Sequence, residues 1–277
     1  MPGKTLLNGS LLEPGLSADR AFHFGDGLFE TLAVVDGLPC LWDLHYQRLS
    51  EGCHRLAIPA PDQDVLYAEA TSLAQGQHRA VLKIVVSAGS GGRGYARPLT
   101  LAPTRWLQVT SWPDAAHYRD TCALKLQWCE MRLGEQPVLA GVKHLNRLEQ
   151  VLARRELRQP AVEGLMCDQR GNVIEGIMTN LFLEHAGSFV TPALVGCGVT
   201  GVVRRLFLER AQRAGVEVRV TGVTPEMVAQ AERLYVTNSL LGIRPVASLG
   251  EQQYPHARLE GFLAELHAEC FSAGSAA

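Results

Sequence analysis

Two apolar runs near the start of the chain are joined by the dipeptide Asp36-Gly37, in the stretch GLFETLAVVDGLPCLW. An Asp-Gly pair readily adopts the positive φ angles of a two-residue hairpin turn, so this stretch predicts two antiparallel strands. An isolated hairpin is only marginally stable in water, because it cannot bury its apolar face. The rest of the chain must therefore supply further strands or helices to cover it.

Helical and strand patterns alternate along the chain, which predicts a mixed α/β (α+β) fold. The stretch DLHYQRLSEGCHRLAI predicts a helix capped by Asp43, with an apolar side that includes Leu49 and Cys53. Helical geometry places Arg48 within this apolar sector, which is an unusual place for a cation. A helix ending at Gly215 and one capped by Thr224 are predicted later. Further strands are predicted at residues 80–89, 105–112, 187–194 and 216–220. Two strands around a turn at Gln169–Asn172 are predicted within residues 164–185, and a strand followed by a loop is predicted within residues 233–246.

The length of 277 residues fits one large domain or two ordinary ones. The region Pro113–Asp120 lies between two differently patterned halves and is the predicted connection between them. We therefore expect an N-terminal domain at residues 1–114 and a C-terminal domain at residues 115–277.

Charge and cysteine content exclude several classes of function. The 26 basic and 28 acidic residues are mixed along the chain, so neither nucleic acid nor an acidic membrane surface is an expected partner. The 7 cysteines are odd in number, scattered and without a C-x-x-C pair, so no metal site is expected. They indicate reduced thiols in a cytoplasm. No apolar stretch is long enough to span a bilayer, and an unexported protein is expected.

A lysine, Lys143, precedes a predicted helix in AGVKHLNRLEQVLARREL, where Leu145, Leu148 and Leu152 repeat at helical spacing. A lysine at such a junction can be a solvated surface charge. Alternatively, an apolar pocket can lower the pKa of its amine and prepare it to form an imine with an aldehyde.

The segment GVKHLNRLEQ closely resembles the active-site segment of the branched-chain aminotransferase-like, fold type IV family of pyridoxal-phosphate enzymes. Its KHLNRLEQ core is most similar to the aminodeoxychorismate lyase branch, and matching motifs follow in order from Asp19-Arg20 to Pro245. The resemblance implies a smaller N-terminal α/β domain, a larger β-rich C-terminal domain with helices, and pyridoxal 5'-phosphate (PLP) bound between them. It also implies a homodimer in which the partner subunit contacts the substrate.

The resemblance assigns the cofactor's partners residue by residue. Lys143 would bind the cofactor covalently and act as the catalytic base. Glu175, in VIEGIMTNLF, would lie beside the pyridine nitrogen, and otherwise it is an ordinary charge at a strand end. The phosphate would be held by Val199 and Thr200 of GCGVTGVVRRLF, by Ser239 of VTNSLLGIRPV and by Arg48, which could instead extend to solvent from the helix edge.

Two motifs bear on the reaction. GSGGRGYARP resembles a loop of aminodeoxychorismate lyases in which the arginine faces the substrate's carboxylates, so Arg93 is the expected substrate-binding residue, and otherwise a solvated loop arginine. In FGDGLFETLAV, Thr31 stands where the lyase branch also has threonine, and the resemblance places it near the reacting centre. His144 and Asn146 either orient the cofactor or serve as a surface histidine and a helix cap.

The resemblance thus implies a lyase that converts 4-amino-4-deoxychorismate into 4-aminobenzoate and pyruvate in folate biosynthesis. A branched-chain or D-amino-acid aminotransferase of the same fold is the alternative, because Glu30 occupies a position where some lyases have threonine and transaminases commonly have glutamate. A catalytically silent binding relative is a third possibility, which the presence of both Lys143 and Glu175 disfavours.

Overall fold

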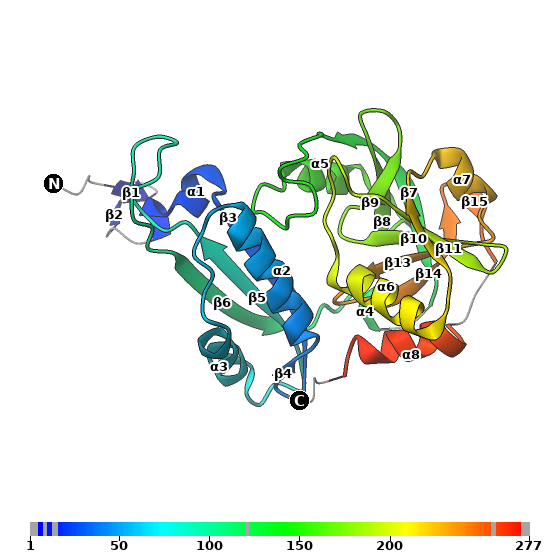
Figure 1. Cartoon of the computed structure of the whole chain (residues 1–277), viewed down its shortest axis with the longest axis horizontal. Coiled ribbons are helices and arrows are strands. Elements are labelled where there is room, and N and C mark those ends of the chain that lie inside the picture. The colour runs from blue at the N-terminus through cyan, green and yellow to red at the C-terminus, as the bar shows by residue number, and fades with distance from the viewer. Residues whose placement is uncertain (1–4, 8–9, 13–15, 120–121, 256–258, 273–277) are drawn as a thin grey trace.

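The computed structural model describes residues 5–7, 10–12, 16–119, 122–255 and 259–272. Figure 1 shows two lobes, each with its own sheet, and a helix of the first lobe that faces the second. Among the described residues, the first lobe contains a four-stranded sheet and the second a nine-stranded sheet. The mixed α/β class predicted from the sequence is confirmed.

The first sheet is antiparallel and has the strand order β4-β3-β5-β6. Its strands are β3 (Gly27–Val35), β4 (Leu38–Pro39), β5 (Arg79–Ser87) and β6 (Thr104–Ser111). Asp36 and Gly37 join β3 to β4 with φ angles of 48° and 79°, so the predicted hairpin is confirmed.

Two helices, α2 (Trp42–Arg55) and α3 (Gln63–Ala74), pack against this sheet and bury side chains such as Leu49, Cys53 and Leu66. The prediction that Asp43 caps α2 is wrong. Leu41 is the N-cap in a left-handed conformation, and Asp43 lies within the first turn. The remaining elements of this lobe are β1 (Thr5–Leu7), β2 (Ser10–Leu12), a short 3-10 helix (Leu16–Ala18) and α1 (Arg20–Phe24).

The second sheet has the order β12-β11-β10-β13-β14-β7-β8-β9, with β15 paired to β14. Its strands are β7 (Leu124–Leu133), β8 (Glu163–Asp168), β9 (Val173–Gly176), β10 (Asn180–His185), β11 (Ser188–Pro192), β12 (Val218–Thr221), β13 (Arg233–Asn238), β14 (Gly242–Leu249) and β15 (Gln252–Gln253). The predicted strands of this half are present, and the predicted turn at residues 169–172 lies between β8 and β9. Residues 164–185 form three strands instead of two, and the loop expected before residue 246 includes the start of β14. The interior strand β7 was not predicted.

The helices of the second lobe are α4 (Ala116–Arg119), α5 (Leu148–Glu156), α6 (Val202–Ala214), α7 (Pro225–Gln230) and α8 (Gly261–Glu269). The predicted ends are confirmed at two of them, because Gly215 closes α6 at a φ of 68° and the Thr224 side chain accepts a hydrogen bond from Met227 N–H at the start of α7. Helix α6 packs on the sheet through Phe207, whose ring stacks on Phe182 with centroids 4.0 Å apart.

Helix α5 differs from its predicted form. It begins at Leu148, so Leu145 precedes it, and Leu145 N–H instead donates to the carbonyl of Gly27. Leu148 and Leu152 are 76% and 45% exposed, and Ala153 is the buried residue of the helix. Its apolar repeat therefore does not face the core of the chain.

The predicted domain boundary at residue 114 lies between the end of β6 and the start of β7. The last residue of the predicted connection, Asp120, lies outside the described residues, so the boundary stays a prediction. Within the described ranges, no helix combines the length and apolarity needed to cross a membrane. The same residues contain no cluster of three or more His, Cys, Asp or Glu side chains suited to a metal ion. All seven cysteines are free thiols.

Candidate active site

A cavity of about 640 Å³ is lined by residues of both lobes. The first lobe contributes Phe29 and Thr31 from β3, and Arg48 from α2. The second contributes, among others, Lys143, Glu175 and Ser239. With Val199, six of the residues singled out from the sequence therefore meet in one cavity, although Thr31 and Ser239 lie 208 positions apart in the chain.

Lys143 is held by backbone hydrogen bonds to β3. Its carbonyl accepts from Phe29 N–H at 3.1 Å, and its amine lies 4.2 Å from the centre of the Phe29 ring. The side chain is half-buried and faces the cavity. Burial of the amine, reinforced by the nearby charge of Arg48, lowers the pKa of Lys143 to about 7. A large share of the amine is therefore neutral, and nucleophilic, near neutral pH.

Glu175 is the penultimate residue of β9 and is only 4% exposed. One carboxylate oxygen accepts from Val199 N–H at 2.8 Å and lies 3.5 Å from the Asn180 amide nitrogen. Burial raises the pKa of Glu175 to about 7. A cationic hydrogen-bond donor placed in the cavity beside it would stabilise the carboxylate and offset the cost of burying it.

Arg48 is buried, as its position on α2 predicted, and is held by Glu30. Its Nε donates to Glu30 Oε1 at 2.8 Å, its Nη2 donates to Oε2 at 2.5 Å, and its Nη1 donates to the Thr200 carbonyl at 3.1 Å. His45 Nδ1 lies 2.6 Å from the same carboxylate. Burial alone would raise the pKa of Glu30, but Arg48 and His45 outweigh it and lower the pKa to about 2.

Glu30 faces α2 and is absent from the cavity wall, while its neighbours Phe29 and Thr31 line it. Successive side chains on a strand point to opposite faces, so the single step from residue 30 to residue 31 changes sides of the sheet. Residue 30 therefore makes no direct contact with a substrate in the cavity. For this reason, its identity does not distinguish a lyase from an aminotransferase.

Of the other three residues expected at the phosphate, Val199 and Ser239 line the cavity and Thr200 does not. Val199 lines the cavity, but its N–H is donated to Glu175. Thr200 N–H donates to the Gly141 carbonyl at 3.1 Å, and its own carbonyl accepts from Arg48. Ser239 lines the cavity, and its hydroxyl donates to the Thr31 carbonyl at 2.6 Å. Their role at a phosphate stays a prediction.

The N-terminus of α6 reaches the same cavity, because Gly201 and Val202 line it. The first N–H groups of a helix have no partner within the helix, and the helix dipole favours an anion there. This end of the cavity, with Arg48 beside it, suits a phosphate.

Two buried hydroxyls in the cavity wall were missed by sequence reasoning. Thr179 and Thr237 are 4% and 1% exposed, both line the cavity, and their Oγ1 atoms have no hydrogen-bond partner. A buried hydroxyl without a partner is costly, so a polar ligand is the natural way to satisfy both. Their positions within EGIMTN and VTNS, beside Asn180 and Ser239, were the available signal.

His144, Asn146 and Arg93 lie outside this cavity. Asn146 donates its amide to the Gly25 carbonyl at 3.1 Å, and burial lowers the pKa of His144 to about 4. Arg93 is on the exposed loop after β5, where its carbonyl accepts from Ala96 N–H. The structure therefore does not bring Arg93 to this cavity.

The polar groups of the cavity wall fit PLP. A buried lysine amine suits its aldehyde, a buried carboxylate suits a protonated pyridine nitrogen, and Arg48 with the start of α6 suits its phosphate. The unpartnered hydroxyls of Thr179 and Thr237 provide further polar contacts for the same group.

Residues 27–249 match the model of the amino-transferase class IV family, and the chain belongs to that family. The family consists of PLP-dependent enzymes with the fold type IV architecture. The chain is 37% identical to the aminodeoxychorismate lyase of Vibrio harveyi over 234 residues, which cover 83% of this chain and 86% of the relative.

Solved structures agree with this assignment. The 4-amino-4-deoxychorismate lyase of Pseudomonas aeruginosa is 42% identical and superposes with a TM-score of 0.84, covering 93% of this chain and 94% of that one. A hypothetical aminotransferase of Mycobacterium tuberculosis in its PLP-bound form has a TM-score of 0.78 at 22% identity, with 95% and 96% covered. At that identity the similarity shows the fold alone.

Proposed function

We propose that this chain is a PLP-dependent carbon-oxygen lyase that converts 4-amino-4-deoxychorismate into 4-aminobenzoate and pyruvate, a step of folate synthesis. The observation that carries the proposal is the meeting of Lys143, Glu175 and Thr31 in one cavity, in a chain that is 37% and 42% identical to two lyases of this name. The aminotransferase alternative loses its support from Glu30, because that side chain faces away from the cavity.

PLP, when bound, supplies an electron-accepting ring that stabilises negative charge on the substrate carbon bearing the amine. Lys143 is the base that removes the proton from this carbon, because its amine lines the cavity and burial lowers its pKa to about 7. Breaking the ether bond then makes the substrate ring aromatic and releases the enolpyruvyl fragment. Lys143 returns the proton to the methylene carbon of that fragment, which leaves as pyruvate. The reaction consumes no second substrate.

The remaining residues bind and orient. Glu175 would keep the pyridine nitrogen protonated, and Arg48, Val199, Thr200 and Ser239 would hold the phosphate. Thr31 would orient the substrate or assist proton transfer, since it lines the cavity on the same wall as Phe29.

The partner we propose is a second copy of the chain. Leu148, Val151 and Leu152 on α5 are 76%, 54% and 45% exposed, and Val151 also lines the cavity. A contiguous exposed apolar surface at the mouth of a site is typical of a protein interface. In the homodimer, Arg93 would reach the substrate of the partner subunit, which accounts for its distance from its own cavity. Seven free thiols support a cytoplasmic location.

The deciding experiment is an assay of purified, PLP-loaded protein with 4-amino-4-deoxychorismate, in which 4-aminobenzoate and pyruvate are measured together without added keto acid. Equal amounts of both products over many turnovers support the lyase. Turnover that requires a keto acid, or no 4-aminobenzoate at all, contradicts it.

A further inference from the structure

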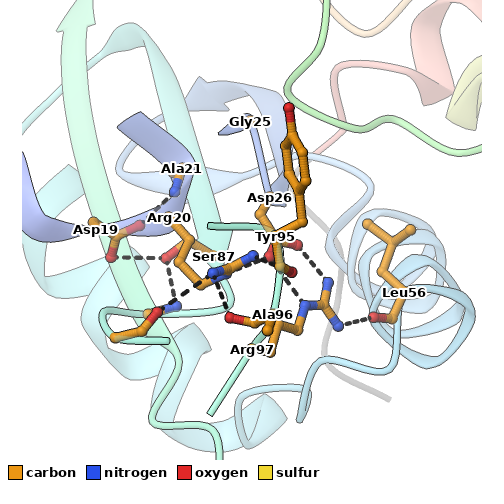
Figure 2. A network of polar contacts seen from close by, with 12 residues as sticks. Asp19, Arg20, Ala21, Gly25, Asp26, Leu56, Ser87, Tyr95, Ala96 and Arg97 are labelled. Atoms are coloured by element: carbon orange, nitrogen blue, oxygen red, sulfur yellow. Dashed lines mark hydrogen bonds and ion pairs between the residues drawn. The ribbon is translucent and has the colours of Figure 1, made fainter. Parts of the chain in front are cut away.

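The exposed glycine-rich loop that carries Arg93, residues 90–96, is built around the side chain of a single buried arginine. Arg20 begins α1 and is 4% exposed. Its guanidinium donates to the carbonyls of Gly91 and Gly94 at 3.3 Å, of Ala96 at 3.2 Å and of Tyr95 at 3.1 Å. Figure 2 shows this guanidinium within the network, with the Tyr95 ring pointing away from it.

Asp26 fixes the guanidinium in place and ties it to the end of the loop. It accepts from Arg20 Nε at 2.7 Å and from Arg97 Nε at 3.0 Å, and Arg97 Nη2 makes a second contact with it. Arg97 Nη1 also donates to the carbonyl of Leu56, just after α2, at 2.6 Å. Arg97, at the exit of the loop, is thereby bound both to Asp26 and to the end of α2 (Figure 2).

The backbone curls too tightly around Arg20 for a side chain at Gly92. A Cβ there would lie 2.0 Å from the Ala96 carbonyl oxygen and 3.3 Å from Arg20 Nη1, and the residue has a φ of 81°. Glycine is thus required at this position. On the outer side of the turn, Tyr95 packs on Phe24 with ring centroids 5.5 Å apart, and Arg20 lies over the same Phe24 ring at 4.9 Å.

The segment that holds the loop also holds the backbone around Lys143. Immediately after Asp26, the Gly27 carbonyl accepts from Leu145 N–H at 3.0 Å, and Phe29 N–H donates to Lys143 at 3.1 Å. Residues 20–29 therefore fix two separate parts of the chain, one in the cavity and one on the outer surface.

We propose that Arg20 is a positioning residue for substrate recognition, which shapes the 90–96 loop so that Arg93 is presented in a binding geometry before substrate arrives. This inference rests on the proposed function, in which Arg93 binds the substrate's carboxylates. Arg20 itself touches neither the cavity nor Lys143. Lysine at position 20 could keep the ion pair with Asp26 but could not span four carbonyls, because it has a compact ammonium instead of a planar fork.

The test uses PLP-loaded Arg20→Met and Arg20→Lys enzymes, with Arg105→Met as the matched control, because Arg105 forms a surface ion pair with Glu69. Arg20→Met is expected to raise KM for 4-amino-4-deoxychorismate by about ten-fold or more while kcat changes less than about three-fold. The cofactor's visible absorbance should be unchanged, Arg20→Lys should fall between wild type and Arg20→Met, and Arg105→Met should match wild type. A KM unchanged in Arg20→Met, or a loss of cofactor, overturns the proposal.

Combining the substitution with Arg93→Ala gives a second criterion. If Arg20 acts through Arg93, the double variant should have a KM no higher than the more affected single variant. If the effects of the two substitutions on KM multiply instead, Arg20 acts independently of Arg93. That result would contradict the proposal.

Amide hydrogen exchange separates this inference from the proposed function. Exchange at residues 89–97 should accelerate in Arg20→Met and stay unchanged in Arg105→Met, whichever substrate the enzyme uses. Unchanged exchange in the loop overturns the positioning role. If exchange is faster in Arg20→Met but the wild-type enzyme makes no 4-aminobenzoate, the lyase assignment is overturned instead. Arg20 then remains the residue that shapes the loop.

Discussion

Arg48 and Glu30 form a two-point ion pair inside the protein, with nitrogen–oxygen distances of 2.8 and 2.5 Å. Both side chains are less than one-tenth exposed. The carboxylate therefore compensates a cation that would otherwise be buried alone in a ligand-free cavity, and it fixes the direction in which the guanidinium points.

Replacing Glu30 with Gln should destabilise the protein without the cofactor by roughly 3 kcal/mol, because breaking one side of a buried ion pair leaves the other charge uncompensated. Urea unfolding of the variant and of wild type would measure the difference. An equally stable variant would show that Arg48 does not depend on Glu30.

The same pair predicts acid sensitivity. The pKa of Glu30 is lowered from 4.5 to about 2, so its contribution to stability is complete above pH 4.5 and is lost as the pH falls towards 2. Wild type should lose stability over this range more steeply than Glu30→Gln, in which the titrating group is absent. Parallel curves for the two proteins between pH 4.5 and about pH 2 would refute the assignment.

Replacing Lys143 with Ala should reduce lyase turnover by at least about a thousand-fold, because it removes both the covalent attachment point and the proposed base. The visible absorbance of the bound cofactor should also change, while circular dichroism remains that of the folded wild type. Full activity in this variant would exclude the mechanism proposed here.

Uptake of PLP by the cofactor-free protein should depend on pH with a midpoint near 7. The neutral amine of Lys143 is the reactive form, and its pKa is lowered to about 7. Stopped-flow absorbance would measure the rate. Since the pKa of Glu175 is also about 7, Glu175→Gln is the control that assigns the midpoint. A rate that keeps rising up to the ordinary lysine pKa of 10.5 would contradict a lowered pKa.

Mixing subunits tests whether Arg93 acts on the partner's site. Lys143→Ala and Arg93→Ala subunits should each be poorly active alone. Refolded together, half of the dimers should be hybrids with one intact site, so activity should recover to about a quarter of wild type. No recovery would indicate that Arg93 serves its own subunit or that the chain is monomeric.

Local patterns predicted much of the fold because their causes are local. The Asp36-Gly37 turn follows from the φ angles those residues adopt, and the ends of α6 and α7 follow from Gly215 and Thr224. The burial of Arg48 followed from its angular position on α2. The site as a whole was inferred from a family resemblance, because no single local pattern predicts which distant residues meet in one cavity.

The features that were missed depend on residues far away in the chain. Leu148 and Leu152 have helical spacing, but spacing cannot show whether an apolar face meets the core or another molecule. The hydroxyls of Thr179 and Thr237 become significant only because the fold buries both in one cavity wall. Predicting the ion pair between Glu30 and Arg48 would have required knowing which face of β3 packs against α2.

Strand β3 places Phe29 and Thr31 at the cavity and Glu30 at the buried arginine. Three consecutive residues thus serve two purposes. Phe29 and Thr31 form part of the cavity wall, whereas Glu30 fixes Arg48, which itself reaches the cavity from α2. A substitution at residue 29 or 31 would change the cavity wall directly, whereas a substitution at residue 30 would act on the cavity only through the position of Arg48. Alternate positions of this one strand can therefore alter the substrate preference without breaking the buried ion pair.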